Sequence, residues 1–203
     1  MSGQRRSHDW PAYNAAVAEQ PASDLLIQAV AAFDAEGPGP RHAVDLGCGH
    51  GRDTLELLRR GWTVTAIDLT AESLDRLRTR AGPDSRLTTI HAAMEDATWP
   101  SANLVNASRA LPFCAPDRFD ELWARIGASL APRGRFSGHL FGPRLSWASE
   151  VVTHSREAAL DLLAGFEVER FDEFESDETG VLGRPQHTHA FRIVARKRGV
   201  GAA

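Results

Sequence analysis

One short stretch, residues 44–53, combines the side chains and the backbone that could bind and orient a ligand. It reads Val-Asp-Leu-Gly-Cys-Gly-His-Gly-Arg-Asp, with glycine at every second position from 47 to 51 and an acid on either side. Because glycine has no Cβ, such a loop can bend sharply and let a ligand lie against backbone amides. The pattern predicts a buried strand, a tight loop and the first turn of a helix, an arrangement typical of nucleotide-like ligand sites.

Three ligand classes compete for this loop. A phosphate-binding P-loop requires Gly-Lys-Ser or Gly-Lys-Thr, whereas Gly51 is followed here by Arg52 and Asp53. A dinucleotide site shows Gly-x-Gly-x-x-Gly and holds a pyrophosphate. Here the glycines alternate, and the carboxylates of Asp45 and Asp53 would repel a pyrophosphate but suit a cation. The loop therefore predicts S-adenosylmethionine, which carries an amino group and a sulfonium.

The elements on either side of the loop would hold it in place. Residues 41–46 read as a strand that follows a Gly-Pro-Gly-Pro run, and a helix continues to Arg60 before Gly61 ends it. Residues 62–69 form a second apolar strand with Asp68 at its carboxyl end. An acid at this position can accept hydrogen bonds from both hydroxyls of a ribose. The loop and this acid together predict a nucleoside-containing cofactor.

The remaining elements alternate between helices and strands with short connections. Apolar periodicity predicts helices over residues 10–20, 23–36, 71–80, 117–130 and 155–164, and strands over 86–92, 103–107, 135–141, 166–171 and 189–197. We interpret the last two strands as a hairpin with a long acidic connection, and the acidic run 167–178 as a solvated sheet edge. The alternation predicts an α/β fold with a parallel sheet covered by helices on both faces.

Length and composition indicate one domain that is large enough to bury a substantial core. The chain has 203 residues, 42% of them hydrophobic, and a formal net charge of −4. That charge disfavours a nucleic-acid partner. The sequence contains no run of about 18 apolar residues, so we expect no membrane span. The polar segment 1–9 lacks the apolar core of a signal peptide. The two cysteines fit a reducing cytoplasm, and the spacing of Cys and His residues does not predict a metal site. We expect a monomer or homodimer of a single domain, 1–203, with a helical lid over 1–36 and a sheet core over 37–198.

The chain resembles the class I S-adenosylmethionine-dependent methyltransferases over residues 20–198. Residues 44–51 match the first motif of that family, and Asp68, which closes Val-Thr-Ala-Ile-Asp, matches its ribose-binding acid. The resemblance implies a Rossmann-like, seven-stranded, mostly parallel sheet with an antiparallel C-terminal strand. Within the family, residues 51–55 and 61–68 look most like the tellurite-resistance and thiol methyltransferases, a branch that acts on small molecules.

The resemblance also implies which residues bind the cofactor and its product, S-adenosylhomocysteine. They are Asp45, Gly47, Cys48, Gly49, Arg52, Asp68, Leu69, Met94, Glu95 and Asn106. In the family the first motif faces the methionine end, the acid of the second strand takes the ribose, and the loop after the third strand contacts the adenine. Asn106 is the counterpart of a polar residue near the sulfonium. Enzymes that methylate nucleic-acid amines carry Asn/Asp-Pro-Pro-Tyr/Phe at this point, and residues 106–109 depart from that pattern.

The acceptor must be sought where the carboxyl ends of the strands meet, because ligands of open α/β sheets bind there. Arg109 lies in an otherwise apolar segment and suits an anionic acceptor. His187 and His189 are two apart in a strand and therefore face the same side. The residues expected to serve catalysis are Arg109, His139 and His189. Those expected to contact the substrate are Trp10, Tyr13, Ser108, Arg109 and His187.

These observations predict an enzyme that methylates a small, anionic or nucleophilic molecule by in-line transfer. Alignment supplies most of the rate of such a displacement, and an ionised acceptor needs no base. Three alternatives stay open: a natural-product O- or N-methyltransferase with a histidine base, a non-catalytic S-adenosylmethionine-binding partner protein, and an NAD-dependent oxidoreductase. Loss of activity as a histidine protonates would distinguish the first alternative from the leading hypothesis.

Overall fold

The computed structural model describes residues 9–199, so the expectation for residues 1–8 lies outside the described part of the chain. The helices are α1 (Trp10–Val17), α2 (Asp24–Ala35), α3 (Arg52–Arg59), α4 (Ala71–Ala81), α5 (Phe119–Ser129) and α6 (Arg156–Asp161). The strands are β1 (His42–Leu46), β2 (Thr63–Asp68), β3 (Leu87–His91), β4 (Ala102–Ala107), β5 (Leu130–Phe141), β6 (Phe166–Thr179) and β7 (Pro185–Lys197). Short 3₁₀ turns cover Leu111–Phe113, Pro116–Arg118 and Ala148–Glu150.

The strands form one seven-stranded sheet in the order β3-β2-β1-β4-β5-β7-β6. Neighbouring strands are parallel except in the pairs β5–β7 and β6–β7, so β7 alone runs against the others. This confirms the predicted Rossmann-like, mostly parallel sheet with an antiparallel C-terminal strand. The strand order reverses between β1 and β4, and ligands of such sheets bind in the crevice at that reversal. The glycine loop leaves β1 at this point.

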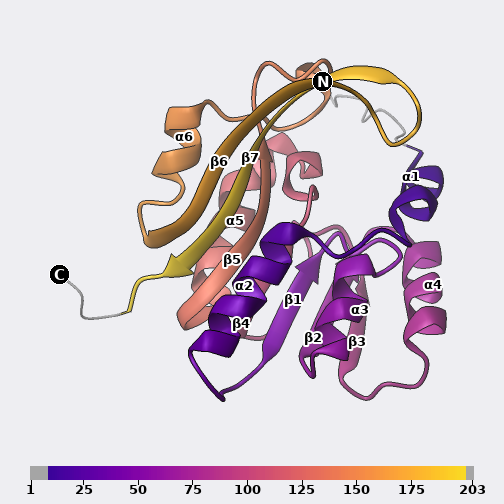
Figure 1. Cartoon of the computed structure of the whole chain (residues 1–203), viewed down its shortest axis with the longest axis vertical. Helices are drawn as coiled ribbons and strands as arrows, with labels where there is room; N and C mark the ends of the chain where they lie inside the picture. Colours follow the sequence, from indigo (N-terminus) through magenta and orange to yellow (C-terminus); the bar gives the residue numbers. More distant parts are fainter. Residues whose placement is uncertain (1–8, 200–203) are drawn as a thin grey trace.

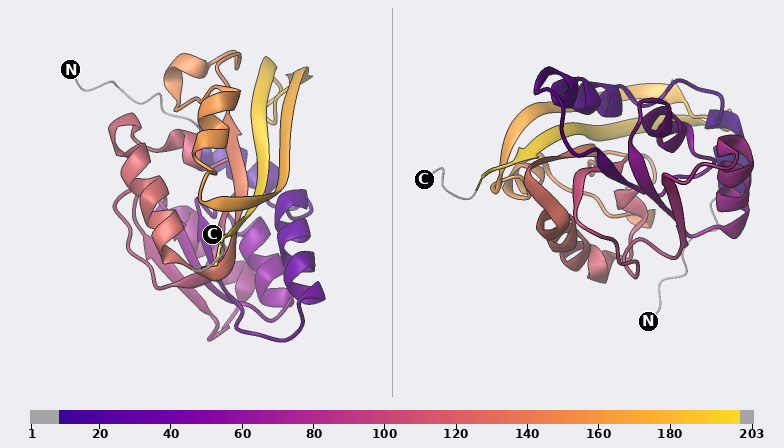
Figure 2. Two further views of the ribbon diagram at one scale, coloured as in Figure 1. Left: turned by 90° about the vertical axis from the view of Figure 1, so that its left-hand side faces the viewer. Right: turned by 90° about the horizontal axis from the view of Figure 1, so that it is seen from below.

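Helices cover both faces of the sheet, as Figures 1 and 2 show. On one face α2, α3 and α4 contribute Leu25, Val30, Leu57 and Leu74 to a core with the inner strands. On the other face α5 and α6 pack a second core that includes Trp123 and the central strand residues. Within residues 9–199 no helix is both long and apolar enough to span a membrane.

The C-terminal hairpin differs from the expectation. The acidic segment after residue 171 is not a long loop, because β6 continues to Thr179 and only residues 180–184 join it to β7. Beyond Phe174 the strand has no apolar residue, but exposed and partly buried positions continue to alternate to Thr179. Its acids pair with basic residues on β7 and on the loop after β5, which compensates their charge. β6 is an edge strand, as the interpretation of the acidic run implied.

The segment expected to form an N-terminal lid divides into two parts. α2 belongs to the covered face of the sheet, because Leu25, Leu26 and Ala29 are completely buried. α1 lies beside the carboxyl edge of the sheet, next to the glycine loop (Figure 1). Its Asn14 donates a hydrogen bond to the Ser73 hydroxyl of α4 at 3.0 Å. α1 and the segment that joins it to α2 border the cleft, whereas the rest of α2 packs on the sheet.

Candidate active site

The loop between β1 and α3 keeps its backbone open to neighbouring segments. Its three glycines have φ of 66°, 52° and 84°, a conformation that L side chains rarely adopt. A Cβ at Gly47 would lie 2.6 Å from Cβ of Ala110. A Cβ at Gly49 would lie 2.8 Å from Oδ1 of Asn14 on α1. The glycines therefore allow both the bend and the close approach of two segments that border the cleft.

Beneath this loop two buried carboxylates share one amide. Asn106 at the end of β4 donates from Nδ2 to Asp45 Oδ1 at 2.8 Å and to Asp53 Oδ2 at 3.1 Å. Thr54 Oγ1 donates to the second oxygen of Asp45 at 2.5 Å. Ser137 donates to Asn106 Oδ1 at 2.8 Å, which fixes the orientation of the amide. Asn106 is completely buried and contacts Asp45 from below, so it lines neither cavity of the cleft and acts on a ligand only through Asp45.

The environment of Asp45 favours a positively charged ligand. Burial first, and then the charge of Asp53, raise the pKa of Asp45 to about 7, although hydrogen bonds from Thr54 and Asn106 lower it. A cation beside this carboxyl would favour the ionised form and relieve the repulsion between the two acids. Burial also raises the pKa of the Cys48 thiol, which therefore stays protonated in the loop.

A first cavity, which we call the β2–β3 cavity, has a volume of about 420 Å³. At its side Asp68 accepts hydrogen bonds from the N–H groups of Gly49 and Thr70, both at 2.8 Å. Each carboxylate oxygen keeps a lone pair for an external donor such as a hydroxyl. Leu69 is 56% exposed here, an apolar surface that a flat ring could cover. The other predicted residues in its wall are Trp10, Tyr13, Gly47, Met94, Glu95, Ser108 and Arg109.

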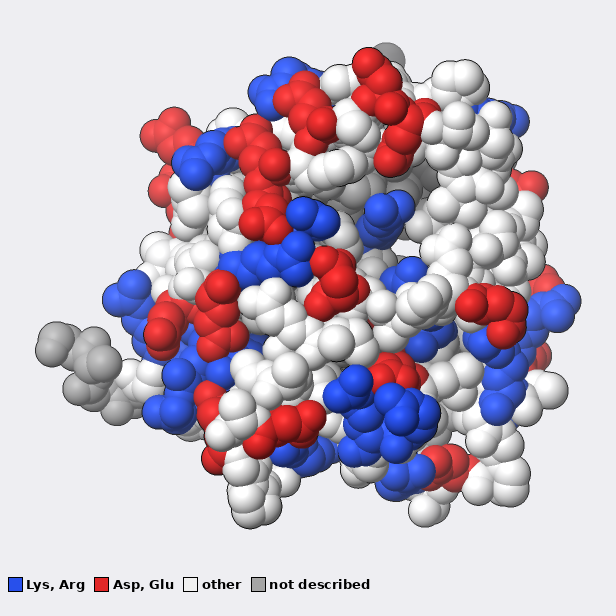
Figure 3. Space-filling view, viewed as in Figure 1, with Lys and Arg blue, Asp and Glu red and all other residues white. Residues whose placement is uncertain are grey.

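A second cavity, the β4–β5 cavity, has a volume of about 270 Å³. It adjoins the first, since both are lined by Tyr13, Asn14, Gly47, Ser108 and Arg109. The space-filling view shows this side of the molecule hollowed below the hairpin, with basic atoms inside the hollow (Figure 3). The other predicted residues in its wall are Asp45, Cys48, Gly49, Arg52 and His139.

Arg109 stands at the junction of the two cavities as an available cation. Within residues 9–199 its guanidinium has no hydrogen bond and no ion pair, and its backbone has a φ of 57°. Such strained positions are concentrated at functional sites. Arg52 is engaged by comparison, because it donates to Asp53 Oδ1 at 3.0 Å and to Ser108 Oγ at 3.1 Å. An anionic group in the cleft would meet Arg109 first.

His139 projects from β5 into the wall of the same cavity. It is 7% exposed, and its Nδ1 is buried without a hydrogen-bond partner among the described residues. Burial, followed by the charge of Arg109, lowers the pKa of His139 to about 3. The ring is therefore neutral near pH 7 and can offer one N–H and one lone pair. A base with so low a pKa gives little driving force for proton abstraction.

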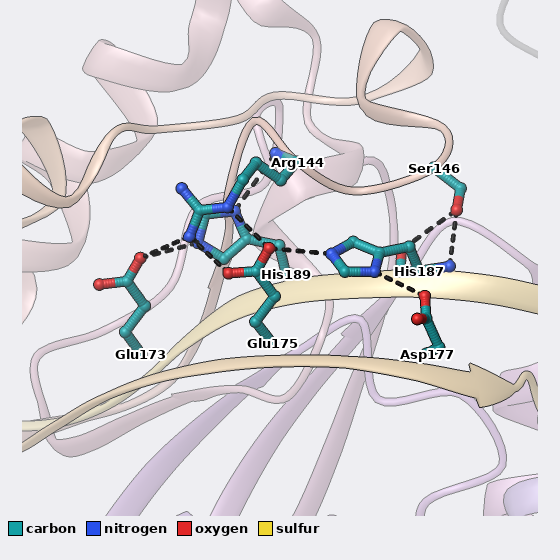
Figure 4. Close-up of polar contacts among 7 residues, drawn as sticks. All are labelled: Arg144, Ser146, Glu173, Glu175, Asp177, His187 and His189. Atoms are coloured by element: carbon teal, nitrogen blue, oxygen red, sulfur yellow. Dashed lines mark hydrogen bonds and ion pairs between the residues drawn. The ribbon is translucent and has the colours of Figure 1, made fainter.

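The two late histidines, which we expected to face the pocket, lie on the hairpin away from the two cavities described here. His189 is 1% exposed and contacts Glu173 at 3.0 Å. His187 lies between Asp177, at 2.7 Å, and Glu175, at 2.9 Å. Figure 4 shows that both rings face the same side, as predicted, but this side meets the loop after β5. Neither residue lines the β2–β3 or the β4–β5 cavity.

Sequence reasoning missed Asn14, Ser137 and Val181. Asn14 lines both cavities and Val181 lines the β4–β5 cavity, while Ser137 orients Asn106. A polar residue on the inner side of a short helix was a usable signal for Asn14. Val181 gave none, because Gly-Val-Leu-Gly reads only as a turn. Among the described residues no group of three His, Cys, Asp or Glu side chains could hold a metal ion.

Comparison with known proteins gives a consistent family signal. The profile of a methyltransferase domain matches residues 43–134, which span β1 to the beginning of β5. TehB from Haemophilus influenzae superposes with a TM-score of 0.71 at 16% identity, over 92% of this chain and 67% of that chain. At this identity the likeness is one of fold. A search among curated protein sequences gives no match.

Two further solved structures extend this comparison. The 1,6-didemethyltoxoflavin-N1-methyltransferase of Burkholderia thailandensis, solved with 1,6-didemethyltoxoflavin and S-adenosylhomocysteine, shares 25% identity and a TM-score of 0.63. That alignment covers 86% of this chain and 79% of the other. An S-adenosylmethionine-dependent methyltransferase from Mesorhizobium loti shares 23% identity and a TM-score of 0.62, over 82% of this chain and 96% of that one.

Proposed function

We propose that this chain is an S-adenosylmethionine-dependent methyltransferase and that it methylates a small anionic or nucleophilic molecule held between Arg109 and His139. The observation that carries the proposal is the guanidinium of Arg109, which lies at the junction of the two cavities with no hydrogen-bond or ion-pair partner in the described part of the chain. A cation left without an internal partner beside a reactive site suits a carboxylate, a thiolate or an oxyanion.

The residues of the cleft fit the cofactor. The β2–β3 cavity offers the Asp68 carboxylate to ribose hydroxyls and an exposed Leu69 face to the adenine, with Met94 and Glu95 nearby. The adjoining wall offers the carboxyl of Asp45 to the amino group. Burial and the charge of Asp53 raise the pKa of this carboxyl, so a cation beside it would stabilise its ionised form. Gly47 and Gly49 leave the space that side chains would fill.

When bound, S-adenosylmethionine supplies an activated methyl carbon. Transfer of that methyl group to a lone pair of the acceptor would break the carbon–sulfur bond, return its electrons to sulfur and release S-adenosylhomocysteine. Arg109 would hold the anionic group, and His139, neutral and buried, would add one hydrogen bond. This positioning aligns the acceptor with the breaking bond, and alignment is the largest contribution that the protein can make. An acceptor that is already ionised has no proton to transfer.

A methyl-transfer assay with a matched arginine variant tests the proposal. Aromatic and aliphatic carboxylates and thiols are screened with S-adenosylmethionine, and release of S-adenosylhomocysteine is measured. Arg109→Gln should raise the acceptor KM by about 10- to 100-fold, because a charge-assisted hydrogen bond contributes about 1.5–3 kcal/mol.

Arg133→Gln is the control for this variant. Arg133 also has a left-handed backbone, with a φ of 64°, but it lies at the start of β5 and lines neither cavity. Equal kinetics of the Arg109 and Arg133 variants, or turnover of neutral acceptors only, would contradict the proposal.

A small-molecule N-methyltransferase of the natural-product type is the second candidate. The likeness to the Burkholderia enzyme, named for N1 methylation of a small heteroaromatic compound, favours it. The version that relies on a histidine base is less well supported, because the pKa of His139 is lowered to about 3. A rate that is independent of pH between 5 and 8 with a pre-ionised acceptor would favour the first candidate.

The remaining expectations belong to the same proposal. We infer a small-molecule rather than a nucleic-acid partner, a cytoplasmic location, and a monomer or homodimer. The chain's formal charge of −4 supports the first of these. Competition between S-adenosylmethionine and NADH in a binding titration tests the cofactor against the oxidoreductase alternative.

A further inference from the structure

The β6–β7 hairpin extends well beyond the sheet that supports it. Pairing between β5 and β7 ends at Phe141 and Ala190, whereas β6 and β7 remain paired to Thr179 and Pro185. The distal part of the hairpin therefore projects past the carboxyl edge of the parallel strands. In Figure 1 it arches over that edge, and its turn comes down on the side of α1.

Contacts on one side of the hairpin brace this projection. The ring of His187 bridges Asp177 and Glu175, and its backbone N–H donates to Ser146 Oγ at 2.6 Å. Arg144 donates to Glu175 at 2.6 Å and 2.7 Å, and both Ser146 and Arg144 come from the loop after β5 (Figure 4). The loop thus fastens the hairpin at a point beyond the sheet.

The opposite side of the hairpin carries a second brace. Thr188 Oγ1 donates to Glu178 Oε1 at 2.6 Å, and the amide of Gln186 donates to the same carboxylate at 3.2 Å. The turn itself is closed by the N–H of Gly180, which donates to the Arg184 carbonyl at 2.8 Å. The contacts with the loop after β5, together with those between β6 and β7, hold the tip of the hairpin in a defined place.

The tip carries two apolar side chains in different surroundings. Val181 is 38% exposed and lines the β4–β5 cavity with Arg109 and His139, whereas Leu182 is 46% exposed and lines neither cavity. The end of α1 and the segment that follows it contribute apolar side chains to the wall of the same cavity, namely Val17, Ala18, Pro21 and Ala22, together with the polar residues Gln20, Ser23 and Asp24. The wall of this cavity therefore combines apolar side chains from the hairpin tip and from the region of α1 with a cation and a neutral imidazole.

We propose that the tip of the β6–β7 hairpin forms the outer wall of the acceptor pocket and that Val181 determines the size of the acceptor. This inference rests on the proposed function. It adds that the acceptor joins its anionic group to an apolar body, a ring or a branched chain, which lies between Val181 and the segment after α1. The cavity volume of about 270 Å³, shared with the methionine end of the cofactor, limits that body to a small molecule.

Ligand-observed NMR tests this inference without relying on turnover. The probes are a graded series of carboxylates, from acetate through isovalerate and benzoate to naphthoate, added to the protein saturated with S-adenosylhomocysteine. We expect benzoate-sized probes to bind the wild-type protein better than acetate. Val181→Trp should weaken the largest bound probe by tenfold or more and spare acetate.

Leu182→Trp is the matched control, because it adds the same bulk to the neighbouring exposed position. We expect it to change probe affinity by less than twofold, and both variants to keep wild-type affinity for S-adenosylhomocysteine. Equal effects of the two variants, no effect of either, or no binding of any apolar carboxylate to the wild-type complex would overturn the inference. Failure of the proposed function would differ, since the probes would still bind while no S-adenosylhomocysteine is released in the methyl-transfer assay.

Discussion

Replacing Asp45 by asparagine should separate cofactor binding from stability. The carboxylate lies in the floor of the β4–β5 cavity and is 2% exposed. A charge-assisted hydrogen bond to a cationic ligand contributes about 1.5–3 kcal/mol. Coulomb attraction between unit charges about 4 Å apart is about 4 kcal/mol at an effective dielectric constant of about 20, which favours the upper end of this range. We therefore expect Asp45→Asn to weaken S-adenosylmethionine binding by about 100-fold or more.

The same substitution should not destabilise the free protein. An amide oxygen can still accept from Asn106, and the amide nitrogen faces the Thr54 hydroxyl, which can rotate to accept. The pKa of Asp45 is raised to about 7 in the folded chain. The folded state therefore holds a proton that the unfolded state releases above about pH 4, and stability falls as pH rises from about 4 to 7. Asp45→Asn removes this loss, which is at most about 4 kcal/mol.

Calorimetry measures both effects. Titration of S-adenosylmethionine at pH 8 gives the affinity, and thermal unfolding of the free protein between pH 5 and pH 8 gives the stability. The variant should bind weakly and unfold at the wild-type temperature or above it at pH 8. Binding within threefold of wild type would refute the role of Asp45, and a variant that unfolds at lower temperature at every pH would refute the account of its burial.

Four further outcomes follow from the structure. His139→Gln should leave the pH profile flat between pH 5 and 8, since the pKa of His139 is already lowered to about 3; a profile that loses an ionisation near neutrality would contradict this. Gly49→Ala should weaken cofactor binding tenfold or more, because the added Cβ would meet the Asn14 side chain. Gly61→Ala is the control, since Gly61 is also left-handed, with a φ of 83°, but has open space around it. Equal effects of the two variants in the titration would argue against the close approach of Asn14 to Gly49. Arg135→Met should cost about 3 kcal/mol in denaturant unfolding, because this buried arginine pairs with Glu36 at 2.7 Å and Glu169 at 2.8 Å, and a loss below 1 kcal/mol would contradict it. The pKa of His187 is raised by hydrogen bonds first to Asp177 and then to Glu175, so the stability that the protonated ring gains by donating to both carboxylates is present below its unfolded pKa and is lost as pH rises through its folded pKa, where the neutral ring keeps one N–H. NMR titration of the ring should show the raised pKa, and an unshifted ring would contradict these contacts.

The sequence predicted the fold well, because the fold depends on local patterns, and the same patterns bring the residues expected to bind the cofactor to one cleft. The apolar strands alternate with amphipathic helices, and the glycine loop and Asp68 sit at the ends of two of those strands. The carboxyl ends of parallel strands meet at one edge, so Asp45, Gly47 and Asp68 were brought together by topology alone. Arg109 and His139 followed for the same reason.

The acceptor side was predicted poorly because it depends on how far a hairpin extends. The acids after residue 171 read as a loop, but pairing with basic residues of β7 and the β5 loop keeps them in a strand to Thr179. That extra length carries His187 and His189 away from the pocket and brings Val181 over it. Asn106 shows a second limit of the sequence-based prediction. Its position at the end of β4 was predicted, but its orientation, which directs its amide to Asp45 rather than into a cavity, depends on hydrogen bonds with Ser137 and Asp53.

The structure of the complex with S-adenosylhomocysteine is the most direct test of the cleft as the methyl-transfer site. We predict the ribose hydroxyls within hydrogen-bond distance of Asp68, the adenine against Leu69 in the β2–β3 cavity, and the amino group beside Asp45. The sulfur would then face Arg109 and the β4–β5 cavity. A ligand bound outside these cavities, or bound with its adenine at Arg109 and its amino group at Asp68, would contradict this assignment.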